Sequence, residues 1–176
     1  MADLPVFAQP DRRTCGPSSL VVARALHEPS YAVRVGAAAG FRAEVLALHR
    51  RVTGWTDRTG RLQLPWPRAL GTAPWAAARD LAATVGTPYR TGRVTADTLT
   101  AATPEAPVAL YVGNRWSPRH VVLVTECREG TLRVYEPSSG RWVDLPLAAL
   151  LGRRFRLAGW DRPWFSVAPR ARRTPA

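Results

Sequence analysis

The residues best suited to chemistry are a cysteine, a glutamine and a histidine in surroundings that suit nucleophilic catalysis. Cys15 lies where a helix over Cys15–His27 is predicted to begin, because Pro17 fits a first helical turn and apolar residues follow at helical spacing. The free amides and positive dipole end of a helix N-terminus stabilise a thiolate, the nucleophilic form of cysteine. On position alone, a small buried apolar cysteine is an equal alternative.

Two further residues give Cys15 the partners that such chemistry needs. Gln9 lies six residues earlier and could donate a hydrogen bond to a developing oxyanion, with the Cys15 amide as the second donor. His120 lies directly before an apolar strand, where it suits the role of general base and then general acid. Gln9 alone reads as an ordinary loop residue, and His120 alone as a structural histidine. His27 ends a helix and His49 is expected on the exposed side of one, so neither competes well.

A carboxylate that orients the histidine is expected at Glu136. This residue follows His120 by sixteen positions, at the end of the next predicted strand. A hairpin turn at Glu129 and Gly130 would bring Glu136 beside the imidazole, which a carboxylate can orient and stabilise when protonated. Asp144 is an alternative third member, and Glu136 could also be a simple turn residue before Pro137.

The order of predicted elements indicates an α+β fold with N-terminal helices packed on a C-terminal antiparallel sheet. Further helices are expected over 41–52, 75–85 and 95–102, and a long ordered loop over 53–74. Strands are expected at 108–112, 121–125, 132–135 and 141–144, with a last one over 155–160. Residues 1–168 are predicted to form one domain and 169–176 a disordered basic tail.

Composition narrows the classes of function. All 25 basic residues are arginine, and the net charge of +12 favours an acidic partner. Nucleic acid is the weaker candidate for that partner, because the arginines are scattered and no nucleic-acid module is recognised. Two cysteines are too few for a disulfide framework or a structural zinc site, so free thiols and no metal are expected. No long apolar segment or secretory signal is evident, so we expect a cytoplasmic protein without a membrane partner.

Taken together, these motifs resemble the papain-like cysteine peptidases that process bacteriocin leaders, also called double-glycine peptidases. The resemblance rests on Gln9 with Cys-Gly-Pro-Ser-Ser-Leu at 15–20, His-Val-Val-Leu-Val at 120–124 and Glu-Pro-Ser-Ser-Gly at 136–140, and it extends over about residues 5–150. The family usually has aspartate where this chain has Glu136. No exporter membrane domain follows in the sequence, so a complete leader-processing transporter is not expected.

The resemblance implies a papain-like fold and acyl transfer through a thioester on Cys15, with no cofactor. The expected catalytic residues are Gln9, Cys15, His120 and Glu136. Gly16, Trp66 and Trp116 are expected to bind substrate, a peptide or protein that is acidic in one hypothesis. Hydrolysis of an amide bond is the first reading. A transglutaminase or other acyltransferase, a glutamine deamidase, and a catalytically inactive binding module on the same fold remain as alternatives.

Overall fold

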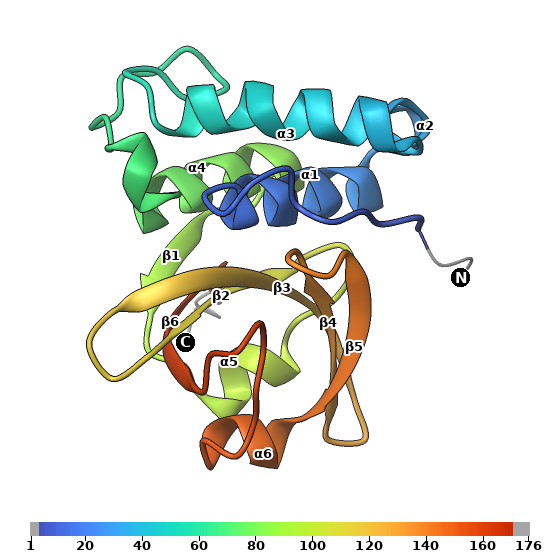
Figure 1. Cartoon of the computed structure of the whole chain (residues 1–176), viewed down its shortest axis with the longest axis vertical. Helices are drawn as coiled ribbons and strands as arrows, with labels where there is room; N and C mark the ends of the chain where they lie inside the picture. The colour runs from blue at the N-terminus through green and yellow to red at the C-terminus, as the bar shows by residue number, and fades with distance from the viewer. Residues whose placement is uncertain (1–3, 171–176) are drawn as a thin grey trace, which may run out of the picture.

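The computed structural model describes residues 4–170 as a helical layer packed on a curled antiparallel sheet (Figure 1). The six strands lie in the order β1-β6-β2-β3-β4-β5, and every neighbouring pair is antiparallel. The helical layer consists of α1 (Cys15–His27), α2 (Pro29–Val35), α3 (Ala38–Val52) and α4 (Pro74–Val85), with a short 3-10 helix η1 (Arg68–Leu70) before α4. The strands are β1 (Tyr89–Gly92), β2 (Val108–Gly113), β3 (Pro118–Arg128), β4 (Thr131–Glu136), β5 (Arg141–Pro146) and β6 (Arg162–Pro169). The predicted α+β class is confirmed.

Both faces of the sheet are covered, which explains why β2 and β3 read as continuous apolar runs. Val121 and Leu123 of β3 belong to the core shared with the helical layer. Val122 and Val124 belong to a second core that includes residues of α5 (Ala96–Thr100) and α6 (Leu147–Leu151). Successive residues of a strand point to opposite faces, so one strand supplies both cores and leaves only its ends free for chemistry.

The last strand differs from the sequence prediction. The segment 155–160 is not a strand but a turn closed by a single bridge between Leu157 and Trp160. Ala158 and Gly159 have φ angles of 51° and 86°, and this left-handed backbone cannot continue an extended strand. The strand is instead β6, inserted between β1 and β2. The Arg170 amide donates to the carbonyl of Pro88 (2.8 Å), and the rest of the predicted tail lies outside the described residues.

The segment before α1 forms what we call the N-terminal strap, residues 4–11, which crosses the turn between β4 and β5. The Gln9 amide donates to the carbonyl of Pro137 (2.7 Å), and the Tyr135 hydroxyl donates to the carbonyl of Phe7 (2.7 Å). Gly140, with φ of 64°, lies so close to the strap that a Cβ there would overlap the backbone of Phe7 and Ala8. The turn therefore fixes the strap by contact with its main chain.

Replacing Gly140 by alanine is expected to displace the strap, and Gly130→Ala provides a matched control. Both glycines are left-handed, but a Cβ on Gly130 (φ 76°) meets nothing within 4 Å. Gly130→Ala should therefore cost about 1–2 kcal/mol of unfolding free energy for its backbone alone. Gly140→Ala should cost about 1–3 kcal/mol more, the usual penalty of overpacking. Urea denaturation of both variants measures the difference, and equal losses would show that the contact with the strap carries no energy.

Candidate active site

Cys15 is the first residue of α1 and is buried, with 5% of its surface exposed. The turn before it is closed by Thr14, whose hydroxyl donates to the carbonyl of Asp11 (3.0 Å) and accepts from the Asp11 amide (3.2 Å). The Ser18 amide donates to the carbonyl of Thr14 (2.9 Å), and the amides of Cys15 and Gly16 have no carbonyl partner within the helix, as is usual at a helix N-terminus. Helix geometry thus gives Cys15 the setting that its sequence predicted.

Gly16, the second residue of α1, packs closely against a neighbouring loop. It is buried, and a Cβ at this position would overlap the side chain of Thr72 from the loop before α4. The carbonyl of Thr72 in turn accepts a hydrogen bond from the buried Tyr111 hydroxyl (3.0 Å). The absence of a side chain at Gly16 therefore allows the loop and α1 to meet closely. The predicted role of Gly16 in substrate binding stays a prediction.

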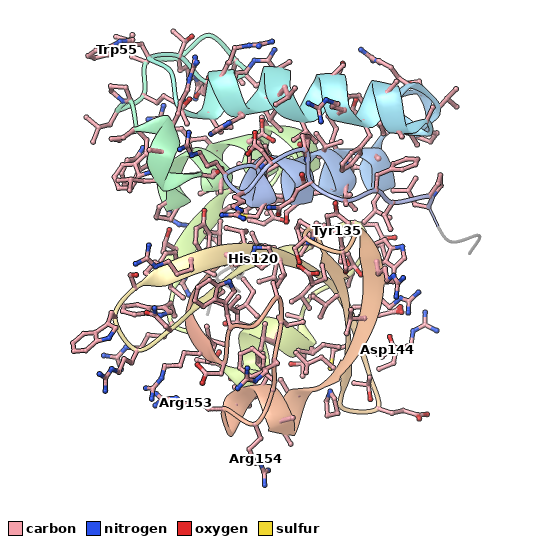
Figure 2. The ribbon with its side chains drawn as sticks, in the orientation of Figure 1. Trp55, His120, Tyr135, Asp144, Arg153 and Arg154 are labelled. Atoms are coloured by element: carbon pink, nitrogen blue, oxygen red, sulfur yellow. The ribbon has the colours of Figure 1, made fainter. Side chains whose placement is uncertain are left out.

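His120 lies near the start of β3, below the helical layer (Figure 2). Its Nε2 atom is 2.7 Å from Oε1 of Glu136, and only 5% and 6% of the two side chains are exposed. A register shift between Val112 and Gly113 lies beside the Val112–His120 pair, and bulges of this kind change the direction of nearby side chains. The two residues, sixteen apart in sequence, thus form one buried pair.

The carboxylate of Glu136 is held by the turn that follows it. Oε1 also accepts from the Ser138 amide (2.9 Å), while Oε2 accepts from the Ser138 hydroxyl (2.7 Å) and the Ser139 amide (2.9 Å). Asp144, the alternative third member, instead pairs with Arg133 (3.1 Å) and is 63% exposed. Only Glu136 of these two carboxylates therefore contacts the imidazole.

These contacts set the charges of the pair. Burial opposes the imidazolium, but the interactions of His120 with the side chains of Cys15 and Glu136 outweigh it and raise the pKa of His120 to about 9. Burial likewise opposes ionisation of Glu136, but hydrogen bonds from His120 and from the two serines lower its pKa to about 2. At neutral pH this favours an imidazolium between a carboxylate on one side and the cysteine sulfur on the other.

Gln9 is brought to this site by the strap. Its Nε2 atom donates to the carbonyl of Asp11 (2.7 Å), which fixes the amide group and leaves its second N–H available. Its Oε1 atom is buried and has no hydrogen-bond partner in the described part of the chain. Because its backbone amide binds Pro137, Gln9 is tied to the residue directly after Glu136.

The two tryptophans predicted to bind substrate lie in the β2–β3 turn and in the loop between α3 and α4. Trp116 is 72% exposed in the β2–β3 turn, where its amide donates to the Asn114 side chain (2.8 Å) and the Arg115 guanidinium covers its ring at 4.4 Å. Trp66 is half-buried and packs edge-on against Trp75, with ring centroids 5.1 Å apart. Their predicted contacts with substrate remain predictions.

One histidine lies elsewhere than expected. His49 is not on an exposed face of α3 but is buried, with 8% of its surface exposed, because the chain segments around Asp11 and Arg68 lie against it. Burial lowers the pKa of His49, so the neutral ring is favoured. Its Nε2 atom has no hydrogen-bond partner within residues 4–170.

Several residues of the site were not predicted from the sequence. Ser138 and Ser139 bind Glu136. The Glu-Pro-Ser-Ser-Gly sequence could have predicted this contact, since serines after a proline favour turns with side-chain hydrogen bonds. Tyr111 and Thr72 carried no such signal, because the first lies inside an apolar strand and the second in a long loop.

The described residues contain two free thiols and no group of side chains suited to a metal ion. Cys15 and Cys127 are both free thiols. Within residues 4–170, no group of three or more His, Cys, Asp and Glu side chains could hold a metal ion. No helix in the same range is long and apolar enough to cross a membrane.

Comparison with known proteins supports the fold. No protein-family model and no curated protein matches the sequence. The peptidase domain of Streptococcus ComA, a bifunctional ABC transporter involved in quorum sensing, is 18% identical with a TM-score of 0.51, covering 96% of this chain and all of that one. A double-glycine-motif protease from an AMS/PCAT transporter, solved with its leader peptide, is 15% identical with a TM-score of 0.49, covering 96% and 94%. The peptidase domain of Streptococcus mutans ComA is 15% identical with a TM-score of 0.46, covering 94% and 99%. The chain therefore has the fold of the ComA peptidase domain, in agreement with the papain-like peptidase fold that the sequence motifs indicated.

Proposed function

We propose that this protein is a cysteine-dependent hydrolase that cleaves an amide bond of a peptide or protein through a thioester on Cys15. The observation that carries the proposal is the buried His120–Glu136 pair, whose imidazole interacts with the side chain of Cys15, the first residue of α1. A buried ionisable pair beside a potential nucleophile is the arrangement expected of an active site. The structural likeness to the ComA peptidase domain supports the same conclusion at the level of the fold.

In the proposed reaction, the Cys15 proton moves to His120 and the thiolate attacks the carbonyl carbon of the substrate amide. The oxyanion that forms is stabilised by the Cys15 backbone amide and by the free N–H of Gln9. His120 then gives its proton to the departing amine, and a thioester remains on Cys15. Water attacks the thioester with His120 as base, which releases the acid and restores the thiol.

Glu136 acts on the imidazole and not on the substrate. Its carboxylate binds Nε2, so Nε2 carries a proton and Nδ1 is the nitrogen that exchanges a proton with the thiol. The pKa of Glu136, about 2, keeps it ionised throughout the working pH range. It is a positioning residue that holds the ring and stabilises its charge.

The alternative activities use this same thioester. An amine in place of water gives an acyltransferase, and a glutamine side chain as substrate gives a deamidase. A catalytically inactive binding module would have little reason to keep His120 and Glu136 buried and charged beside a free thiol.

The reactivity of the Cys15 thiol tests the proposed nucleophile. Iodoacetamide at neutral pH should alkylate Cys15 faster than Cys127, although Cys15 is the more buried thiol, because His120 stabilises its thiolate. Rates are measured by intact mass on Cys127→Ala and Cys15→Ala, so that each thiol is followed alone. His120→Ala should slow alkylation of Cys15 and leave Cys127 unchanged. Labelling of Cys15 no faster than Cys127 would refute an activated nucleophile.

The second prediction concerns pH. The pKa of His120 is raised to about 9, so the charged form required beside the thiolate is present below this pH and is lost as the pH rises through it. Glu136→Gln removes one cause of the raised pKa, so the alkaline limb of hydrolytic activity, which needs the imidazolium to protonate the departing amine, should move to lower pH. Hydrolytic activity should fall about 10- to 100-fold, less than the roughly 10²- to 10⁴-fold contribution of general acid–base catalysis, because His120 itself is retained.

Asp144→Asn is the matched control for Glu136→Gln. Asp144 is an exposed carboxylate of the neighbouring strand that pairs with Arg133 and does not contact His120. Its removal should leave both the pH profile and the rate unchanged. A shift with Asp144→Asn and none with Glu136→Gln would reverse the assignment of the third residue.

We further propose that the substrate carries acidic residues near the cleaved bond. Four exposed arginines flank the site, two directly before α1, one in the β2–β3 turn and one at the start of β3: Arg12, Arg13, Arg115 and Arg119. Paired peptide substrates with glutamate or glutamine beside the scissile bond should differ in KM, and added salt should raise KM for the glutamate peptide only. Equal KM values at low salt would contradict this preference.

A further inference from the structure

In the loop between α3 and α4, one polar side chain points inward and three apolar side chains are exposed to solvent. Gln63 is buried (6% exposed), and its Nε2 atom lies within hydrogen-bond distance of three backbone carbonyls, those of Arg51, Gly54 and Thr56. The side chains on the outside are Trp55, Leu62 and Leu64, which are 70%, 77% and 68% exposed. We call these three residues the Trp55 patch. Exposed apolar side chains that gather in one loop are typical of an interaction surface.

The patch is held in place before any partner arrives. Leu62 and Leu64 flank the inward-facing Gln63 in an extended segment, so they point to the same side. The Gln63 amide donates to the carbonyl of Trp55 (2.8 Å), and the Trp75 indole donates to that of Leu64 (3.1 Å). The apolar side chains are therefore displayed by a rigid loop rather than exposed by a flexible one.

The charge around the patch selects its partner. Residues 50–80 contain six arginines and two acidic residues, Asp57 and Asp80, and Asp80 is buried beside Arg58 (4.0 Å). Asp57 is already satisfied, because it accepts from Thr59, the Arg61 amide and the Arg79 guanidinium. A second copy of a chain with net charge +12 would be repelled, whereas an anionic surface would be attracted.

The shape of the patch favours a surface over a peptide. Trp55 lies at the periphery of the helical layer (Figure 2). Side chains that are more than two-thirds exposed do not line a groove, which an apolar helix or strand requires. Tryptophan and leucine on a basic surface are instead the residues that enter the headgroup region of a lipid bilayer.

We propose that the Trp55 patch docks this protein on an anionic lipid membrane, with Trp55, Leu62 and Leu64 inserted at the interface and the surrounding arginines on the headgroups. This contact is peripheral and needs no helix that crosses the bilayer. It differs from the expectation that the chain has no membrane partner, and it does not depend on the proposed hydrolase activity.

Co-sedimentation of the full chain with vesicles tests the proposal. The protein should sediment with vesicles that contain phosphatidylglycerol and not with pure phosphatidylcholine, and added salt should release it. Trp55→Gln combined with Leu62→Gln should lower the partition coefficient at least about tenfold. Val33→Gln combined with Leu151→Gln, which removes apolar side chains that are 83% and 41% exposed elsewhere, should leave it unchanged.

The possible outcomes distinguish the patch from simple charge attraction. Thermal melting of both double variants verifies that they fold as the wild type does. Sedimentation with neither vesicle would overturn the proposal, as would equal binding of the patch variant and the wild type, which would mean that the arginines act alone. Loss of binding to a poly-glutamate peptide in the patch variant, with vesicle binding intact, would assign the patch to an acidic protein and also overturn it.

Discussion

A hydrogen bond of 2.7 Å between a buried imidazole and a buried carboxylate is the interaction on which the site depends. Its contribution to stability has two limits. For Glu136 the contribution is present above the ordinary carboxyl pKa and is lost as the pH falls toward about 2. For His120 it is present below the ordinary histidine pKa and is lost as the pH rises through about 9. The pair therefore stabilises the fold across the range in which the proposed chemistry would operate.

The turn between β4 and β5 connects this pair to the rest of the site. Its serines bind the carboxylate, the carbonyl of Pro137 holds the Gln9 amide, and the bare Cα of Gly140 leaves room for the strap. One five-residue segment, 136–140, thus positions the carboxylate that binds the proposed base and the strap that carries the proposed oxyanion donor. Parts of the site that are over a hundred residues apart in sequence are placed by the same turn.

The sequence predicted the parts of the site that depend on local rules. The start of α1 at Cys15, the presence of a strand at 121–125 and the turn after Glu136 all follow from residues within a few positions, although β3 begins earlier than predicted, at Pro118, and contains His120. The errors arose where distant contacts decide. His49 is covered by segments remote from α3, and the close approach of Gly16 to Thr72 joins two segments that no pattern relates. β6 was misplaced because its partners, β1 and β2, lie far away in the chain.

The presence of glutamate where the resembling family has aspartate is explained by the same turn. A longer side chain would be expected to place its carboxylate less definitely, since it has one more rotatable bond. Here the carboxylate folds back on the amides of Ser138 and Ser139, so the backbone of the turn determines where its oxygens lie. The extra methylene is absorbed within residues 136–139, and the distance to His120 stays that of a strong, charge-assisted hydrogen bond. The departure from the family pattern therefore changes how the carboxylate is held and preserves what it can do for the imidazole.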